Sequence, residues 1–355
     1  MPQMKIGSRW VGDSHPTYFI ADIAANHDGD LDRAVRLIEL ASQAGADAAK
    51  FQHFRAPHIV SRRGFESMGQ QLSHQAAWNK PVFEVYQSAS VPWEWTERLK
   101  RACDANKIEF LSTPYDLEAI DMLDAYLPAF KIGSGDITWI EELEHIARKK
   151  KPVLLATGAS DLGEVQRAVD AVLAIHPELL LMQCNTNYTA SLKNFSYLQL
   201  NVLKTFASMY PQCVLGLSDH TPGHAAVLGA VALGARAIEK HFTDDCSREG
   251  PDHKFALDPA AWRTMVDRTR ELEGALGDGN KCVQPNEQDT LILQRRCLRA
   301  ARAVAAGTVL SRADVEPLRP APKDAIFPYE LPATLGKTVR RDLQEGDYLR
   351  WIDLA

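Results

Sequence analysis

At Gly216-Leu217-Ser218-Asp219-His220-Thr221, and again at Ile238-Glu239-Lys240-His241-Phe242-Thr243, a short apolar run ends in a histidine. The segment between them, from His224 to Ala235, has helical spacing. Side chains alternate between the two faces of a strand, so Ser218 and His220 share one face, as do Glu239 and His241. Two parallel strands joined by a helix would bring both imidazoles to the same end of a sheet. There they could share one metal ion.

Eight apolar, β-rich runs recur along the chain, and a segment of helical periodicity lies between most of them. The expected strands are Tyr18 to Ala24, Ala48 to Phe54, Ile108 to Thr113, Ala129 to Ser134, Pro152 to Thr157, Leu179 to Cys184, Val214 to His220 and Ala237 to Thr243. Alternation of strand and helix eight times over about 230 residues favours a (β/α)8 (TIM) barrel. A Rossmann-like sheet is the weaker alternative because no GxGxxG follows the first expected strand.

Capping residues mark several of the expected helices. Asp30 is a candidate N-cap for a helix that stops at Gly45. Asp161 and Glu164 have the spacing of a capping box. The segment Asp258 to Leu276 is expected to be the last helix of the barrel.

One connection, from Arg55 to Pro92, is far longer than a usual βα loop and carries Trp78, Phe83 and Tyr86. At the active end of a barrel a loop of this length is often a lid. An ordered excursion that covers the side of the barrel is an equally good interpretation.

The composition indicates a soluble globular protein. The 355 residues are 45% apolar and 24% charged, with a net charge of -6, which suits one large domain and one small one. No cluster of Lys and Arg indicates a nucleic-acid or membrane partner. No apolar run approaches the roughly 20 residues that cross a bilayer, so we expect a cytoplasmic protein. The six scattered cysteines suit reduced thiols.

The tail contains a repeat of its own. The pattern Arg302-x-Val304-x-x-Gly307-x-x-Leu310-x-x-x-Asp314 returns 39 residues later as Arg341-x-Leu343-x-x-Gly346-x-x-Leu349-x-x-x-Asp353. Two related halves predict a small pseudo-twofold β domain, with the Pro-rich segment Leu318 to Pro332 between them expected to be irregular. We therefore expect a barrel over residues 1–283, a linker over 284–296 and a small β domain over 297–355.

Polar residues at the carboxyl ends of the barrel strands are the natural catalytic candidates. Alternation along each expected strand predicts which side chains face the interior of the barrel. They are those of Asp22, Lys50, Gln52, Lys131, Gln183, Ser218, His220, Glu239 and His241. Lys50 and Lys131, with the hydroxyls of Ser112, Thr113, Ser134 and Ser218, suit a phosphate or a carboxylate. The alternative is a structural network in which both lysines pair with Asp22 and Glu239.

His220 and His241 are candidate metal ligands. A lone histidine at a strand end is usually a structural residue, but two at matching ends of consecutive strands favour a metal. Two imidazoles leave the other coordination positions to water, substrate or carboxylate, which suits a Lewis-acid Mn²⁺ or Mg²⁺ ion. Cys184 and Cys246 could add thiolates and favour zinc, but neither has convincing ligand spacing.

Seven motifs follow one another along the chain in a specific order. They are Ile20-Ala21-Asp22-Ile23-Ala24-Ala25-Asn26-His27-Asp28-Gly29, Ala49-Lys50-Phe51-Gln52, Ser112-Thr113-Pro114-Tyr115-Asp116, Phe130-Lys131-Ile132-Gly133-Ser134-Gly135-Asp136, Leu217-Ser218-Asp219-His220-Thr221, Glu239-Lys240-His241-Phe242-Thr243 and Gly250-Pro251-Asp252-His253. They resemble, in this order, the motifs of the sialic acid synthase family. The tail repeat resembles the antifreeze-like (SAF) domain that follows the barrel in that family.

The resemblance implies an enzyme that condenses phosphoenolpyruvate with an open-chain N-acetylated amino sugar to give a nine-carbon 2-keto acid and phosphate. It implies that His220 and His241 hold a divalent metal, with Mn²⁺ expected and Mg²⁺ or Co²⁺ as alternatives. It also implies a domain-swapped homodimer, in which Arg319 of each tail domain reaches the active site of the partner subunit.

The same resemblance implies roles for the remaining candidates. Asp22, Lys50 and Lys131 would be catalytic. The substrates would be bound by Gln52, Ser112, Thr113, Ser134, Asp136, Thr186, Tyr188, Ser218, Asp252 and Arg319.

Three departures from the family pattern concern the acceptor sugar. Asp22 stands where the family has a catalytic glutamate, and Asp136 replaces a second glutamate, so two carboxylates are shorter by about 1.5 Å. The run from Cys184 to Thr189, which contains Thr186 and Tyr188, also differs from the family's usual sequence. The two shortened carboxylates suggest a bulkier or differently substituted sugar.

Three functional hypotheses follow. The first is a metal-dependent synthase that acts on N-acetylmannosamine or on the diacetamido deoxy sugars of legionaminic or pseudaminic acid. The second is another barrel carboligase, such as a class II aldolase, which would not release phosphate from phosphoenolpyruvate. The third is a sugar-binding protein that has lost turnover through Asp22, which predicts that an Asp22→Glu variant gains activity.

Overall fold

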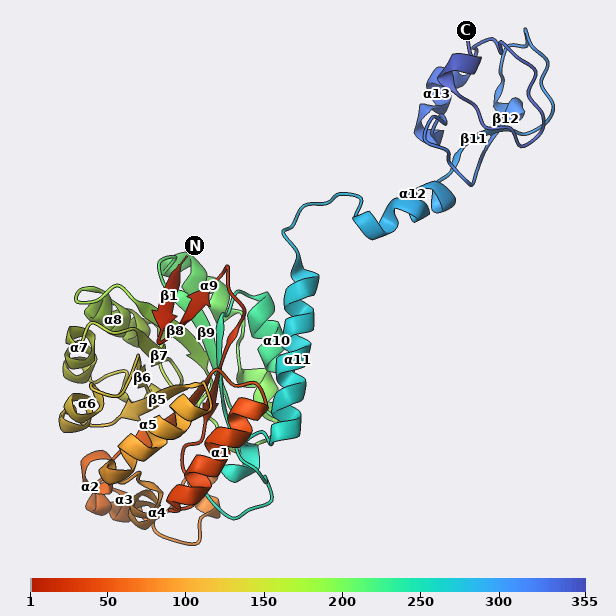
Figure 1. The fold of residues 1–355 in the computed structure, drawn as a ribbon. Helices are drawn as coiled ribbons and strands as arrows, with labels where there is room; N and C mark the ends of the chain where they lie inside the picture. The colour runs from red at the N-terminus through yellow and green to blue at the C-terminus, as the bar shows by residue number, and fades with distance from the viewer. Residues whose placement is uncertain (1) are drawn as a thin grey trace. The chain divides into compact units, whose positions relative to one another are not determined.

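The computed structural model describes residues 2–355, which form two compact units divided between Gly277 and Asp278 (Figure 1). The first unit contains an eight-stranded parallel sheet in the order β5-β4-β3-β10-β9-β8-β7-β6, and its two end strands, β5 and β6, lie beside each other. The strands are β3 (Tyr18–Asp22), β4 (Ala48–His53), β5 (Glu109–Pro114), β6 (Phe130–Ile132), β7 (Val153–Ala156), β8 (Leu179–Cys184), β9 (Val214–Asp219) and β10 (Ala237–His241). Each lies within or within one residue of an expected run, and the predicted barrel is confirmed.

Eight helices surround these strands (Figure 1). They are α1 (Leu31–Gln43), α5 (Thr96–Ala105), α6 (Leu117–Leu123), α7 (Ile140–Arg148), α8 (Leu162–Leu173), α9 (Val202–Met209), α10 (Ala225–Ala232) and α11 (Pro259–Leu276). The predicted caps are present: the Asp30 side chain accepts from the first amides of α1, and Asp161 forms a capping box with Glu164. Asp258 caps α11, which ends at Gly277 with a positive φ of 61°.

A two-stranded hairpin precedes the barrel and was not predicted. It consists of β1 (Gln3–Ile6) and β2 (Arg9–Gly12), and its apolar residues Met4, Ile6 and Val11 pack among the first residues of the barrel strands. These contacts fill the amino-terminal end of the barrel. The carboxyl-terminal end, where the polar strand residues lie, is the end left for a site.

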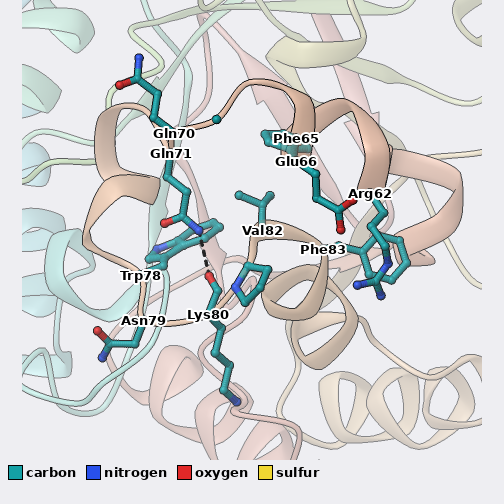
Figure 2. A pocket seen from close by; sticks show the side chains of 12 residues that line it. Arg62, Phe65, Glu66, Gln70, Gln71, Trp78, Asn79, Lys80, Val82 and Phe83 are labelled. Atoms are coloured by element: carbon teal, nitrogen blue, oxygen red, sulfur yellow. Dashed lines mark hydrogen bonds between the residues drawn. The ribbon is translucent and has the colours of Figure 1, made fainter.

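The long connection is an ordered excursion of short helices. It contains α2 (Ala56–Ile59), α3 (Arg62–Ser67), η1 (Ser73–Ala77) and α4 (Val82–Ala89), and η2 (Trp93–Trp95) follows it. The excursion lines an open pocket of about 450 Å³ beside Phe65, Trp78 and Val82 (Figure 2). No predicted site residue lines this pocket.

The second unit is small and rich in turns. It contains η6 (Pro285–Glu287), α12 (Gln288–Gln294), β11 (Cys297–Ala300), η7 (Arg312–Asp314), β12 (Val315–Leu318), η8 (Pro328–Glu330), α13 (Leu331–Thr334) and η9 (Trp351–Asp353). The range 284–296, predicted as a linker, therefore holds η6 and α12. The segment predicted to be irregular between the repeats holds η8 and part of α13.

The repeat of the tail is visible as two equivalent ion pairs. Arg302 contacts Asp314 at 2.6 Å, and Arg341 contacts Asp353 at 3.0 Å. Between the halves, the backbones of Val304 and Leu343 form an antiparallel bridge. The small pseudo-twofold domain is thus built from two copies of one turn. No helix among residues 2–355 combines the length and the apolar character needed to span a membrane.

Candidate functional site

Register brings the polar strand residues together at the carboxyl end of the barrel. The strands predicted to be neighbours, β9 and β10, pair in parallel with Ser218 opposite Glu239. On the other side of β10, His241 is opposite Asp22, and Asp22 is in turn opposite Lys50 of β4. Asp22, Lys50 and His241 therefore occupy one level of three adjacent strands.

A buried ion-pair network lies at the centre of this level. The Lys50 Nζ atom is 2.7 Å from Asp22 Oδ2 and 3.8 Å from Glu239 Oε1, and Lys131 Nζ is 3.4 Å from the same Glu239 oxygen. All four side chains are buried. Burial acts to lower the pKa of Lys50, but Asp22 and Glu239 outweigh it and the pKa is raised. Lys50 is thereby held as a cation where it could meet an anionic substrate.

The network also matches the structural alternative, in which both lysines pair with carboxylates. Two observations favour a binding role beside it. The second oxygen of Glu239, Oε2, is buried without a hydrogen-bond partner among residues 2–355, and so is the Thr113 hydroxyl. A network built for stability alone would satisfy such atoms, because an unpaired buried polar group costs about 1–3 kcal/mol.

The two predicted metal ligands lie side by side in the same cluster, with their rings tilted by 47°. The ring centroids of His220 and His241 are 5.4 Å apart. His220 Nδ1 lies 3.0 Å from the carbonyl oxygen of Asn185, which assigns the proton to Nδ1 and leaves the lone pair on Nε2. His241 Nδ1 is buried and has no hydrogen-bond partner within the described chain.

The electrostatics around His241 suit a metal ligand. Burial, together with His220 and Lys50, lowers the pKa of His241 well below its usual value, so the ring is neutral as ligation requires. Two carboxylates stand near it, Asp22 at 3.6 Å and Asp252 at 3.9 Å. The residues present therefore fit a divalent ion.

A closed protein cage is a different arrangement, and residues 2–355 do not form one. No group of three or more His, Cys, Asp or Glu side chains in that range is arranged to enclose an ion. An ion held here would take its remaining ligands from water and substrate.

Cys184 stands next to this pair. Burial acts to raise the pKa of its thiol, but His220 outweighs burial and the pKa of Cys184 is lowered. For the same reason, although burial opposes it, the pKa of His220 is raised. Cys246, the other sulfur considered for zinc, instead lies 3.3 Å from the carbonyl oxygen of Ala256.

Small hydroxyls and a backbone amide form a cradle beside Lys131. The Ser134 hydroxyl accepts a hydrogen bond from the Gly158 amide at 2.9 Å. A Cβ atom on Gly158 would lie 1.9 Å from the Thr186 hydroxyl and 3.0 Å from the Cys184 sulfur, so only glycine fits. Such a close approach of backbone to hydroxyls suits a phosphate or carboxylate oxygen.

Not every predicted anion-binding hydroxyl turns toward the cluster. The Ser112 hydroxyl lies 2.7 Å from His53 Nδ1 and 3.0 Å from the carbonyl oxygen of Phe51. It is therefore engaged with buried neighbours on its own side of β5. Thr113, the next residue, lies on the opposite face of that strand. Ser218 is 3.3 Å from Glu239 and belongs to the cluster.

Three of the residues predicted to bind the acceptor are Gln52, Asp136 and Asp252. Gln52 donates to Asp22 at 3.1 Å, and Asp252 accepts from the amide of Ala25 at 3.1 Å. Burial raises the pKa of Asp136 to about 6, against the opposing charge of Lys131. Burial also raises the pKa of Asp252 to about 6. Both carboxyl groups therefore titrate near neutral pH.

Aromatic rings complete the wall around Tyr188. Its ring centroid lies 4.4 Å from that of His220, 4.8 Å from His74 and 5.3 Å from Phe255. The excursion thus contacts a predicted site residue through His74, which the sequence interpretation missed. Periodicity contains no signal for this contact, because it depends on how loops fold back.

Arg319 belongs to the second unit, whereas the other predicted site residues belong to the first. It lies directly after β12, and its side chain is exposed. Its predicted role toward a partner subunit stays a prediction.

Comparisons with known proteins agree with these observations. Residues 37–281 match the NeuB family and residues 295–355 match the SAF domain. An uncharacterised protein of Methanocaldococcus jannaschii is 36% identical over 100% of this chain and 99% of its own length. The N,N'-diacetyllegionaminic acid synthase of Campylobacter jejuni is 34% identical over 94% of this chain and 99% of its own length. A crystal structure of the N-acetylneuraminic acid synthetase of Leptospira borgpetersenii, in complex with citrate, has a TM-score of 0.71 and 29% identity, covering 81% of this chain and 95% of that one.

Proposed function

Since the chain belongs to the NeuB family and carries a SAF domain, we propose that it condenses phosphoenolpyruvate with an N-acetylated amino sugar. The products would be phosphate and a 2-keto acid of the sialic acid type, with nine carbons when the acceptor is a hexosamine. We propose that the reaction depends on a divalent metal, with Mn²⁺ as the first candidate, and that the protein acts in the cytoplasm as a domain-swapped homodimer.

One observation carries this proposal: two buried lysines and two imidazoles converge at the carboxyl end of the barrel. Lys50 and Lys131 would bind the carboxylate and phosphate of phosphoenolpyruvate, aided by Ser134 and Ser218. Ammonium groups and hydroxyl donors in a buried site bind such oxygens strongly because water does not screen them. The anionic substrate would thus displace part of the present carboxylate pairing.

His220 and His241 would hold the metal, which when bound would act as a Lewis acid on the aldehyde oxygen of the open-chain sugar. Asp22 and Asp252 are close enough to His241 to orient water or substrate around such an ion. Gln52, Asp136 and Tyr188 would position the sugar.

The bonds balance without a redox partner. C3 of phosphoenolpyruvate forms a bond to the aldehyde carbon, which becomes a hydroxyl-bearing carbon, and a water oxygen adds to C2. The bond between C2 and the phosphate oxygen then breaks, which leaves the 2-keto group and inorganic phosphate. Asp22, paired with Lys50 at 2.7 Å, would take one proton of the water and pass it to the aldehyde oxygen, and the other proton would leave with the phosphate.

A diacetamido deoxy sugar is the second candidate acceptor. The similarity to an N,N'-diacetyllegionaminic acid synthase favours it, as do the shortened side chains of Asp22 and Asp136. An acceptor of this kind carries an extra acetamido group, which needs more room than a hydroxyl. N-acetylmannosamine remains the reference substrate.

The test is phosphate release from phosphoenolpyruvate with Mn²⁺ across a panel of N-acetylmannosamine and diacetamido deoxy sugars. We expect release with at least one sugar, loss of release with chelator, and loss in a His220→Ala variant. Release that needs no sugar would contradict the proposal. If the chain binds phosphoenolpyruvate but releases no phosphate with any sugar of the panel, the result would favour a binding protein.

A further inference from the structure

The loop after β10, residues 243–257, carries two groups toward the proposed metal site. Its ends are joined by backbone hydrogen bonds from the Thr243 amide to the Leu257 carbonyl and from the Leu257 amide to the His241 carbonyl, at 3.1 and 2.9 Å. Near its far end, the ring of Phe255 lies 4.8 Å from that of His241, and Asp252 is 3.9 Å from the same histidine. Whatever holds this loop therefore sets the position of both groups.

His253 lies between them and is completely buried. Both of its ring nitrogens have partners: Nδ1 lies 2.7 Å from the Thr243 hydroxyl and Nε2 lies 2.9 Å from Asp28 Oδ1. A carboxylate only accepts hydrogen bonds, so the ring proton belongs on Nε2, and Nδ1 accepts from the threonine hydroxyl. The relay Thr243–His253–Asp28 thus joins the loop to the first βα connection.

Asp28 is itself anchored. Its second oxygen, Oδ2, accepts from the Arg248 side chain at 2.8 and 3.0 Å and lies 3.1 Å from Arg33. Arg33 also forms a two-point pair with Asp244, at 2.6 and 2.8 Å, near the start of the loop. The outer end of the relay is therefore fixed from both the loop and helix α1.

The backbone of the loop closes tightly over the imidazole. A Cβ atom on Gly250 would lie 2.6 Å from His253 Cδ2. The loop is thus shaped around the His253 ring rather than merely lying beside it. Three residues of this sort could also suggest a hydrolytic triad, but both Thr243 and His253 are completely buried, so no substrate could reach the hydroxyl.

We propose that the Thr243–His253–Asp28 relay is a positioning device that holds Asp252 and Phe255 against the His220/His241 metal site. The inference rests on the proposed function, because it assigns the relay to the metal and acceptor side of that site. None of the three relay residues would touch substrate. Lys50 and Lys131 come from β4 and β6, outside the loop, so binding of phosphoenolpyruvate should not depend on the relay.

The experiment removes one relay hydrogen bond at a time from the full chain. Thr243→Val deletes the hydroxyl at constant shape, and Asp28→Asn removes the anion while suiting the left-handed backbone at that position, where φ is 53°. Thr269→Val is the matched control, because Thr269 is equally buried and its hydroxyl donates to the Met265 carbonyl at 2.8 Å within α11. Each variant is measured for Mn²⁺ affinity, from the electron paramagnetic resonance signal of free Mn²⁺, and for the KM of both substrates.

We expect Thr243→Val and Asp28→Asn to weaken Mn²⁺ binding about tenfold, as loss of a group that orients metal ligands does, and Thr269→Val to change it less than twofold. The acceptor KM should rise in the relay variants while the phosphoenolpyruvate KM stays constant. A purely structural role would give Thr243→Val and Thr269→Val the same profile, or would raise both KM values together, and either result would overturn the inference.

The outcome separates this inference from the proposed function. A chain that binds Mn²⁺ but releases no phosphate with any sugar refutes the function, and the Mn²⁺ affinities of the variants still judge the relay. A chain that binds no Mn²⁺ refutes the role assigned to the relay.

Discussion

Replacing Lys50 by methionine should destabilise the protein as well as inactivate it. The substitution keeps most of the volume of the side chain but removes the charge that faces Asp22 at 2.7 Å and Glu239 at 3.8 Å. All three side chains are buried, with Lys50 only 1% exposed. Glu239 would then keep Lys131 at 3.4 Å, while Asp22 would lose its lysine partner.

The size of the effect follows from this geometry. At 2.7 Å and an effective dielectric constant of about 20, the Lys50–Asp22 attraction is about 6 kcal/mol before desolvation of the ions is subtracted. Removing one member of a buried pair typically costs about 3–5 kcal/mol, because the remaining charge stays buried. We therefore expect Lys50→Met to lower the free energy of unfolding by about 3–5 kcal/mol. A second substitution, Asp22→Asn, should restore part of that loss.

Urea unfolding at pH 7, followed by circular dichroism, measures both variants. The matched control is Arg263→Met, which breaks the exposed pair between Arg263 and Asp267 and should cost less than about 1 kcal/mol. Binding of phosphoenolpyruvate to Lys50→Met is measured in parallel and should be lost. The reasoning is refuted if Lys50→Met is no more destabilising than the surface control, or if adding Asp22→Asn lowers stability further.

Three further predictions concern a buried acid, the acceptor and the partner subunit. Burial, then Asp136 and Asp116, raise the pKa of Glu142 from 4.5 to about 9, so its contribution to stability is fully present below pH 4.5 and is lost as the pH rises toward 9. Between pH 5 and 8 the free energy of unfolding of the parent should therefore fall by about 4 kcal/mol more than that of Glu142→Gln, as measured by thermal or urea unfolding. An equal pH dependence of the two proteins would contradict this. Tyr188→Phe should raise the acceptor KM about tenfold through loss of one hydrogen bond and leave the phosphoenolpyruvate KM unchanged; equal changes in the two constants would count against its assignment. Arg319→Ala and His220→Ala chains, each inactive alone, should recover about a quarter of full activity when unfolded and refolded together, because half of the dimers would be mixed and each would hold one intact site; no recovery would argue against the swapped dimer.

Much of the barrel could be predicted from the sequence because its signals are local. The barrel strands consist almost entirely of buried residues, and caps such as Asp30 and Asp161 are complete within four residues of sequence. The N-terminal hairpin could not be predicted in the same way. Its strands are four residues long, and only the packing of Met4 and Ile6 inside the barrel shows what they do.

The centre of the site was also predictable, since it depends only on alternation and on the order of strands. Asp22, Lys50 and His241 meet because their strands are neighbours in register. Contacts made by loops follow no such rule. His253 and Asp28, 225 residues apart, are joined only because two loops happen to fold onto each other, and His74 reaches Tyr188 only through the path of the excursion.

The departures from the family pattern become easier to interpret in the structure. Asp22 is only 2% exposed, and its carboxylate already contacts Lys50, Gln52 and the Ala24 amide. A shorter carboxylate is therefore accommodated by a complete set of partners. This arrangement supports an adapted site more than a damaged one, although the gain or loss of activity in Asp22→Glu decides between them.

The measurement that tests the central claim most directly is mass spectrometry of both products after reaction in ¹⁸O-labelled water. The chain is incubated with Mn²⁺, phosphoenolpyruvate and each sugar of the panel. We predict a 2-keto acid with the mass of the sugar joined to the three-carbon unit and with the ¹⁸O of water at C2. The inorganic phosphate should carry no ¹⁸O, because water adds to C2 and the bond between C2 and the phosphate oxygen breaks. Labelled phosphate accompanied by pyruvate, with no condensed product, would mean simple hydrolysis and would contradict the account.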